Sequence, residues 1–223
     1  MCDAMGAFVG SSFGPWGMGV GAIGASAWAA CHWRQLDNFI LTIKLFTPTI
    51  QSEEYVQAIS LSDNEADQYD LLGLVHNTAL SAIFATYDFD DIEAMSYTEL
   101  SPIALREVTN TGYLYRSPIF SANSSKTVVS LAQGYMEQSD YDAYKALDLY
   151  CIYNPEQVND CLLLKNYLST LENISDEDIV NWQVDYRNTI EAAGISSNSK
   201  QIMRACMSIG LASAELWEYQ EQQ

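Results

Sequence analysis

An N-terminal segment without charge constrains this chain more than any other feature. From Ala4 to Cys31 the sequence runs for 28 residues with no acidic, basic or histidine side chain, and this stretch holds seven of the 12 glycines. Burial of apolar surface is the main favourable contribution to folding, so a segment of this composition is rarely left in water. It requires either a lipid environment or close packing against other parts of a protein.

The glycines of this segment are regularly spaced. Gly6, Gly10 and Gly14 recur at intervals of four residues, and a second series follows Pro15. Residues four apart share one face of a helix, and small side chains there let two helix backbones approach closely. Gly14-Pro15 predicts a break between two helices, and therefore a helical hairpin. The residues expected to form the helix-packing stripe are Gly10, Gly14, Gly17, Gly21 and Ala25.

Two environments for this hairpin are open. Its second helix, Pro15 to Arg34, would extend roughly 30 Å, about one hydrocarbon thickness, so residues 4–34 could contact or span a membrane. The segment is nevertheless rich in Gly, Ala and Ser, which insert weakly, so a hairpin buried in a protein core is equally compatible. A signal peptide is disfavoured, because the acidic Asp3 stands where a basic residue is expected.

Length and charge limit what the rest of the chain can be. The 223 residues, 48% of them hydrophobic, are sufficient for a globular core. The formal net charge is −19, and the ten basic residues do not cluster, so nucleic acid is not an expected partner. The same charge repels anionic lipid, which leaves residues 4–34 as the membrane-contacting part. Composition divides the chain into a glycine-rich apolar segment, 1–35, here called the leader, and an acidic helical domain, 36–223.

The pattern beyond the leader predicts an all-α fold, a bundle of about six to eight helices that includes the N-terminal hairpin. Apolar residues between Asp67 and Tyr87 recur with a period near 3.6. Residues 37–50 are compatible with either a short strand or a helix. Small residues on the last helix predict close packing, with the leader as a candidate neighbour. Further helices are expected at 101–110, 126–138, 140–152, 155–172, 176–193 and 199–220.

Three local signals mark the ends of these helices. Asn154-Pro155 and Gly194 are typical of helix termini. Ser175 followed by Asp178 is typical of a capping box at a helix start.

The five cysteines predict no metal site and no disulfide framework. There is no C-x-x-C pair in the sequence. Cys151 and Cys161 could pair across the turn at Asn154-Pro155 in an oxidising compartment, although free buried thiols are the favoured interpretation. Cys31-His32 lacks a second pair of ligands, so we expect no metal there and no cofactor elsewhere.

An acidic segment partly matches a calcium-binding loop. Asp88, Asp90 and Glu99 occupy positions 1, 3 and 12 of an EF-hand. The match then fails, because Ile92 stands at position 5 and Glu93 replaces the glycine at position 6. Helix capping is therefore favoured over calcium binding.

One polar element within the predicted helix at 67–87 is the candidate binding site. A glycine inside a helix leaves a notch for another backbone or a ligand, and His76 beside it can hydrogen-bond through either ring nitrogen. A notch at a helix crossing, with His76 and Asn77 holding a neighbouring loop, is favoured over catalysis, because no nucleophile motif such as G-x-S-x-G accompanies the histidine. No catalytic residue is predicted. The candidate binding residues are Tyr69, Asp70, Gly73, His76 and Asn77.

Two elements together carry a resemblance. The leader begins Asp3-x-x-Gly6-Ala7, and the later element reads Y-D-x-x-G-x-x-H-N from Tyr69 to Asn77. Both resemble a family of small uncharacterised bacterial proteins that have a glycine-zipper leader. In that family a proline usually precedes the tyrosine, whereas this chain has Gln68. The resemblance covers only these two segments and implies a pattern rather than an activity.

Two functions from different classes follow. In the first, a non-enzymatic protein uses the glycine-zipper leader for membrane interaction or self-assembly into a homo-oligomer, as a secreted or membrane-associated antagonistic factor of bacteriocin-like type would. In the second, a soluble helical binding or structural module buries the leader in its core, and the Gly73/His76 face meets a protein partner of unknown identity. An enzyme is the third and least supported class.

Overall fold

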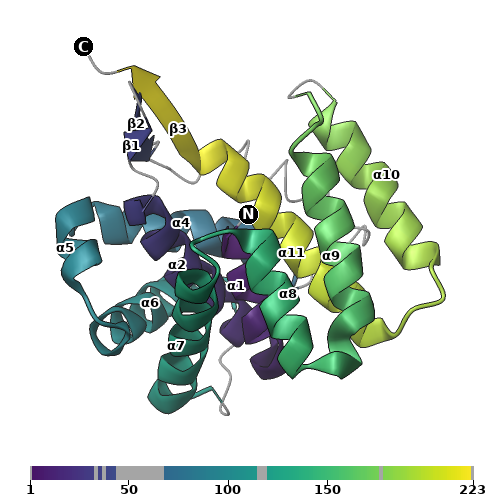
Figure 1. Ribbon diagram of the computed structural model, residues 1–223, viewed down its shortest axis with the longest axis horizontal. Coiled ribbons are helices and arrows are strands. Elements are labelled where there is room, and N and C mark those ends of the chain that lie inside the picture. Colours follow the sequence, from purple (N-terminus) through teal and green to yellow (C-terminus); the bar gives the residue numbers. More distant parts are fainter. Residues whose placement is uncertain are drawn as a thin grey trace.

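The computed structural model describes residues 2–32, 35–36, 39–43, 68–114, 120–175 and 178–221. Over these residues the protein is an all-α bundle, as predicted, in which peripheral helices surround two central N-terminal ones (Figure 1). The helices are α1 (Cys2–Gly10), α2 (Gly14–His32), α4 (Leu72–Phe84), α5 (Phe89–Ala94), α6 (Tyr97–Thr111), α7 (Ala122–Gln138), α8 (Ala143–Tyr153), α9 (Val158–Leu171), α10 (Ile179–Ala192) and α11 (Ser197–Leu216), with short 3-10 turns η1 (Ser11–Phe13) and η2 (Pro155–Gln157).

A small antiparallel sheet accompanies the helices, in the order β1 (Gln35–Leu36), β2 (Phe39–Ile43) and β3 (Trp217–Glu221). In its register Ile43 pairs with Trp217. Of the two possibilities open for residues 37–50, the described part is therefore a strand. The prediction that the last helix continues to 220 is wrong, because the chain leaves α11 after Leu216 and pairs its backbone with β2 instead.

The leader folds back on itself as the predicted hairpin. η1 and Gly14, whose φ is +64°, make the turn between α1 and α2. A Cβ atom added to Gly10 would lie 2.0 Å from the carbonyl oxygen of Gly17, and one added to Gly6 would lie 2.3 Å from that of Gly21. Such distances are shorter than any van der Waals contact, so the two backbones touch. Gly14 serves the turn rather than the packing stripe.

The hairpin lies inside the bundle. Phe8, Met18 and Ile23 are fully buried and belong to one hydrophobic cluster with side chains of α4, α6, α7 and α11. Cys206 of α11 donates its S–H to the carbonyl oxygen of Ala4 at 3.6 Å, so the last helix does pack against the leader. The compositional boundary at residue 35 thus does not separate two cores. Within the described residues, no helix has the length and apolarity that crossing a bilayer requires.

Cys151 and Cys161 form a disulfide that joins the end of α8 to α9 across η2. The expectation of free buried thiols at these two positions is therefore wrong. The turn at Asn154-Pro155 reverses the chain after only one 3-10 turn, which brings the two Cα atoms to 6.8 Å. Cys2, Cys31 and Cys206 form no disulfide.

The acidic segment after α4 caps helices. Asp88 accepts the N–H of Asp91 at 2.8 Å and, with it, forms a capping box at the start of α5. Glu99 closes a similar box with Ser96 at the start of α6. These boxes confirm the predicted helix capping. Within the described ranges, no group of three metal-ligating side chains occurs. Helix α5 itself was not predicted.

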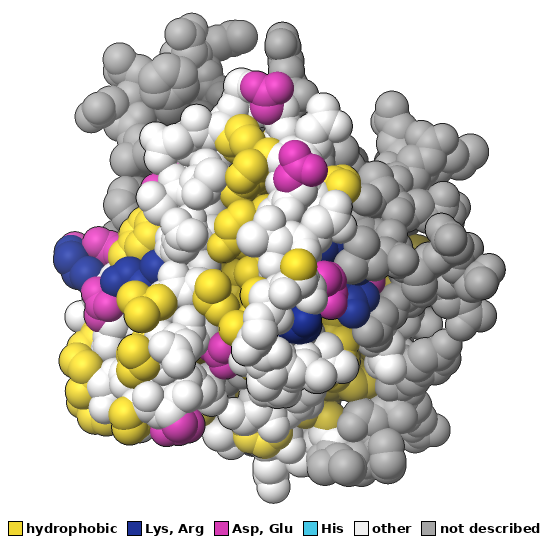
Figure 2. Space-filling view, turned by 90° about the vertical axis from the view of Figure 1, so that its right-hand side faces the viewer, with side chains coloured by type: hydrophobic (Ala, Val, Ile, Leu, Met, Phe, Trp, Pro, Cys, Tyr) yellow, Lys and Arg dark blue, Asp and Glu magenta, His cyan; other side chains and the backbone are white. Residues whose placement is uncertain are grey.

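The surface on the side of α9 and α10 is sparsely charged (Figure 2). An interrupted line of apolar side chains runs down this face. Among large apolar residues, Ile152, Tyr153 and Leu162 are the most exposed, at 70%, 68% and 59%. They lie on α8 and α9 close to the disulfide.

Two glycines of α2 provide a direct test of the backbone contact. A Cβ on Gly21 would lie 2.2 Å from the carbonyl oxygen of Gly6, whereas one on Gly19 would make an ordinary contact of 3.4 Å with Leu72. We expect Gly21→Ala to lower the free energy of unfolding by about 1–3 kcal/mol. Its control Gly19→Ala should raise it by up to about 1 kcal/mol through helix propensity. Urea denaturation measures both, and equal effects of the two substitutions would contradict the packing described here.

The disulfide leads to two predictions, one for the number of reactive thiols and one for the free energy of unfolding. Alkylation of the unfolded, unreduced chain should modify three of the five cysteines. Replacing Cys151 and Cys161 together by alanine should cost about 2–3 kcal/mol, the value expected for closing a loop of this length. Five reactive thiols in protein purified without reductant would contradict the pairing.

Candidate functional site

The element from Tyr69 to Asn77 attaches α4 to α11. The N–H of Gly73 donates to Ser208 Oγ at 2.8 Å, and a Cβ on Gly73 would lie 2.3 Å from the Ser208 carbonyl oxygen. Asn77 Nδ2 donates to the carbonyl oxygen of Ala212 at 2.7 Å. The notch predicted at Gly73 exists, and the backbone of α11, rather than a ligand or a loop, fills it.

Asp70 stabilises the contact between α4 and α11 through ion pairs. Its carboxylate accepts hydrogen bonds from Arg204 Nε and Arg187 Nη2, each at 3.1 Å, and its carbonyl oxygen accepts the Ser208 hydroxyl at 2.6 Å. Asp70 and Arg187 are almost fully buried. Removing one partner of a buried ion pair costs about 3–5 kcal/mol, because it leaves the other charge uncompensated. Asp70 is therefore placed as a structural residue of the α4–α10–α11 junction, with Tyr69 partly buried beside it.

His76 faces the leader rather than solvent. It is fully buried, and its Nε2 lies 3.7 Å from Oδ2 of Asp3 in α1. Its Nδ1 is 2.9 Å from Oδ1 of Asn77. Because the amide of Asn77 donates to the Ala212 carbonyl, its oxygen must be the acceptor for the histidine. In neutral His76 the proton is therefore on Nδ1, and the Nε2 lone pair points toward Asp3.

The pKa values of His76 and Asp3 are both lowered, for different reasons. Burial lowers the pKa of His76, although Asp3 and Asn77 oppose the shift. Burial would raise the pKa of Asp3, but the amino group at the start of the chain, His76 and Ser213 outweigh it, so its pKa falls below 3.8. At neutral pH the arrangement consists of an ionised Asp3 beside a neutral His76.

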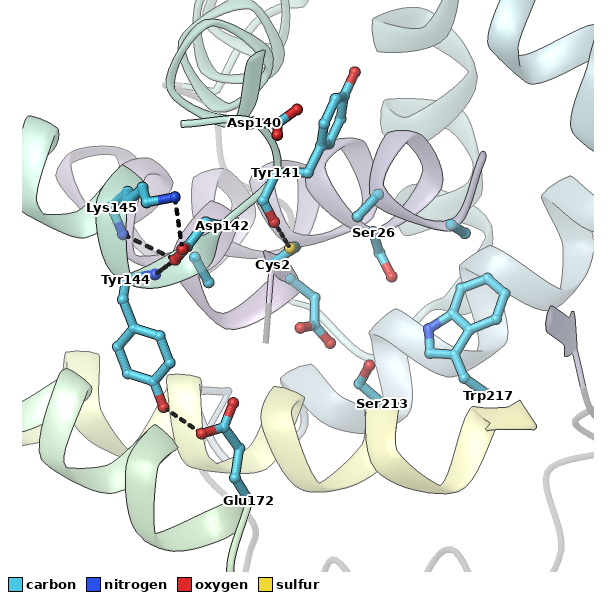
Figure 3. A pocket seen from close by; sticks show the side chains of 14 residues that line it. Cys2, Ser26, Asp140, Tyr141, Asp142, Tyr144, Lys145, Glu172, Ser213 and Trp217 are labelled. Carbon is cyan, nitrogen blue, oxygen red and sulfur yellow. Dashed lines mark hydrogen bonds and ion pairs between the residues drawn. The ribbon is translucent and has the colours of Figure 1, made fainter. Parts of the chain in front are cut away.

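Asp3 also lines a cavity of about 700 Å³ that sequence reasoning did not predict. Several elements meet there: the start of α1, the end of α2, the turn between α7 and α8, the end of α9, and the junction of α11 with β3 (Figure 3). Trp217 stands on one side of the lining and Tyr144 on the other, with Cys2 between them. The polar and aromatic lining residues are Cys2, Asp3, Ser26, Asp140, Tyr141, Asp142, Tyr144, Lys145, Glu172, Ser213 and Trp217.

The turn between α7 and α8 has an unusual backbone. Asp140 and Tyr141 have φ values of +54° and +59°. The N–H of Tyr141 donates to the Met136 carbonyl at 2.8 Å and that of Asp140 to the Glu137 carbonyl at 3.2 Å, the pattern in which a helix usually ends on glycine. Left-handed conformations of non-glycine residues cluster at functional sites. Here they direct the Tyr141 carbonyl toward Cys2, whose S–H donates to it at 3.4 Å.

The neutral polar groups of the cavity keep their protons. Burial raises the pKa of the Cys2 thiol to about 11, with the charge of Asp3 contributing. Burial, with Glu172 as the next cause, raises the pKa of Tyr144 to about 12. A thiol with a raised pKa is a poor nucleophile, so Cys2 does not resemble an activated catalytic cysteine. The cavity offers neutral donors, aromatic rings and carboxylates.

Little in the sequence pointed to this cavity. Its residues come from five parts of the chain and form no local motif. Asp140 occupies the place of the usual C-terminal glycine, but its left-handed conformation is seen only in the backbone angles and not in the sequence. Of the predicted binding residues, His76 approaches the lining, through Asp3, whereas Asp70, Gly73 and Asn77 contact α10 and α11.

Comparison with known proteins gives no relative. The chain matches no protein-family model, and neither a curated protein nor a solved structure shows significant similarity to it. The resemblance of its leader and Y-D-x-x-G-x-x-H-N element to small bacterial proteins therefore stays a prediction, and function must be argued from the site.

The left-handed turn predicts a stabilising substitution. Asp140→Gly should raise the free energy of unfolding by about 0.5–1 kcal/mol, because glycine adopts a positive φ without steric cost. The control Asp140→Ala, which removes the same carboxylate but keeps a β-carbon, should not stabilise. Urea denaturation distinguishes them. If alanine stabilises as much as glycine, the gain comes from charge and not from the backbone.

His76 predicts an acid-sensitive fold. Its folded pKa is lower than its ordinary value of 6.5, so below about pH 6.5 the unfolded chain takes up a proton that the folded protein does not. Stability should therefore fall with decreasing pH in that window, by up to about 1.4 kcal/mol per pH unit. Asp3, with its lowered pKa, adds a further loss only below about pH 3.8.

Denaturation series at pH 7.5, 6.5 and 5.5 for wild type and His76→Gln isolate this contribution, since His32 is present in both. The variant should lose the slope between pH 6.5 and 5.5. An unchanged slope would assign it to another group.

Proposed function

We propose that this protein is a helical binding module and that the cavity between the hairpin, α7–α8, α9 and α11 holds a small, partly apolar molecule. The observation that carries the proposal is the cavity itself, whose volume of about 700 Å³ lies in the usual range of ligand sites. Its lining combines buried alanines with a few converging polar groups, as small-molecule sites do. Backbone strain at Asp140 and Tyr141 also borders this cavity.

This proposal corresponds to the second predicted function, a helical binding module with the leader in its core. The binding site is the cavity instead of the Gly73/His76 face. The leader helps to build the site, since Cys2, Asp3, Ser26, Ala29 and Ala30 all line the cavity. The face of α4 expected to meet a partner is occupied by α11.

Membrane interaction and self-assembly through the leader stay predictions, and both would require the leader to give up contacts that it makes in this fold. Residues 4–31 would have to leave the core before they could enter lipid, at the cost of the apolar contacts that they share with the surrounding helices, among them α4, α6, α7, α8 and α11. Self-assembly through the glycines would likewise replace contacts that they make within the chain. Exposed Ile152, Tyr153 and Leu162 are alternative contact residues for a second copy.

Titration with N-phenyl-1-naphthylamine, an uncharged dye that fluoresces in apolar surroundings, tests the binding proposal. One molecule should bind per chain with a dissociation constant of about 10–200 μM, from roughly 0.3–0.4 kcal/mol per non-hydrogen atom. Ala30→Phe, which places a ring in the cavity, should abolish binding. The control Ala214→Phe, at an exposed position of α11 outside the lining, should not.

Circular dichroism should show that both variants remain folded. Absence of dye binding by the wild type, or equal binding by folded Ala30→Phe, would refute the cavity as a ligand site.

A further inference from the structure

We propose that the molecule held in the cavity is an organic cation, an amine or ammonium group attached to an apolar body. This inference rests on the proposed binding function and adds the chemical class of the ligand. It is carried by the charges and rings that line the cavity.

Charge around the cavity is strongly one-sided. Four carboxylates line it, those of Asp3, Asp140, Asp142 and Glu172. Lys145 Nζ lies 3.3 Å from Asp142 Oδ2, and the amino group at the start of the chain interacts with Asp3. The charge in excess is therefore that of Asp140 and Glu172, which repels an anionic ligand and attracts a cation. The net charge of −19 over the whole chain adds a long-range field of the same sign.

The buried carboxylate on the inner wall is already compensated. Asp3 is only 1% exposed, and its lowered pKa keeps it ionised at neutral pH. It interacts with the amino group at the start of the chain, with His76 and with Ser213. The inference therefore rests on the exposed carboxylates of Asp140 and Glu172 and not on Asp3.

Aromatic rings supply the second element of cation recognition. Trp217, Tyr141 and Tyr144 contribute to the lining, from three different segments. The phenols stay neutral, because burial raises the pKa of both tyrosines. Ring faces attract ammonium groups, and tryptophan does so best. Carboxylates and aromatic rings around one cavity are a combination that favours cations over neutral molecules of the same shape.

The position of the acidic groups indicates how such a ligand would lie. Asp3 and Ser213 are buried on the inner side, while Asp140 and Glu172 are exposed at the rim. Glu172 accepts the hydroxyl of Tyr144 at 2.8 Å, which fixes both side chains on one side of the opening (Figure 3). A cation therefore encounters the carboxylates of Asp140 and Glu172 on entry.

Three compounds with one skeleton test the inference. 4-Phenylbutylamine, 4-phenylbutanol and 4-phenylbutyrate differ in the charge of the head group, and their affinities can be measured at pH 7 by calorimetry and by displacement of N-phenyl-1-naphthylamine. The amine should bind at least tenfold more tightly than the alcohol, and the carboxylate should bind most weakly. The preference for the amine should shrink as salt is raised, because ions screen the rim charges.

The double variant Asp140→Asn and Glu172→Gln tests whether the preference for the amine comes from the carboxylates of the cavity. Asparagine tolerates a positive φ, and glutamine retains an acceptor for Tyr144, so the fold should be preserved. Affinity for the amine should drop at least threefold, with binding of the dye and the alcohol unchanged. The control Glu156→Gln and Asp185→Asn removes the same charge from exposed residues outside the lining and should have a smaller effect on amine binding.

The outcomes separate the two proposals. Dye binding with equal affinity for amine and alcohol, or with tightest binding of the carboxylate, would overturn the cation inference and leave the cavity as a binding site. An equal loss in the control double variant would assign the preference to net charge and also overturn it. Failure of the wild type to bind either the dye or the amine would refute both proposals.

Discussion

Direct contact between the backbones of α1 and α2 sets the dimensions of the whole bundle. Gly6 lies against Gly21 and Gly10 against Gly17, with no room for a methyl group at either crossing. The two helices therefore form a thin, rigid pair that α4, α6, α7, α8 and α11 can surround (Figure 1). Glycine is unfavourable in helices, and the close packing that it permits here offsets that cost.

This hairpin also determines where polar chemistry can occur. Its helices are almost uniformly apolar, and their buried polar side chains, Asp3 and Ser26, lie toward the start of α1 and the end of α2. Asp3 at the start of α1 faces His76 of α4, and Ser26 near the end of α2 faces the cavity. The α4–α11 junction, held by Asp70, Gly73 and Asn77, keeps His76 in position behind Asp3. The element that looked like a binding motif thus supports one wall of the cavity from behind.

Much of the fold could be predicted because it depends on local patterns. Spaced glycines predicted the hairpin, a 3.6-residue period predicted α4, and Asn154-Pro155 predicted the end of α8. The sheet and the end of α11 could not be predicted, since β3 depends on a partner strand some 180 residues earlier in the chain. The disulfide was considered, but the spacing of Cys151 and Cys161 alone does not fix their geometry.

The site was harder to predict than the fold. The Tyr69–Asn77 element was singled out correctly as a glycine notch, yet the identity of the neighbour that fills it, α11, follows only from tertiary packing. The cavity is assembled from residues as distant as Cys2 and Trp217, which no sequence spacing connects. Asp140 and Tyr141 are its one local signature, and it resides in backbone angles rather than in residue types.

The central claim is that the glycine-rich leader forms the core of the folded protein. Native-state hydrogen exchange, resolved along the chain, tests it most directly. Amides of residues 4–10 and 17–31 should be among the slowest to exchange, opening only with global unfolding, as slowly as those of α4 and α11. If the leader exchanges rapidly while α4 and α11 stay protected, the hairpin is a detachable segment, and this account of the bundle and its cavity is wrong.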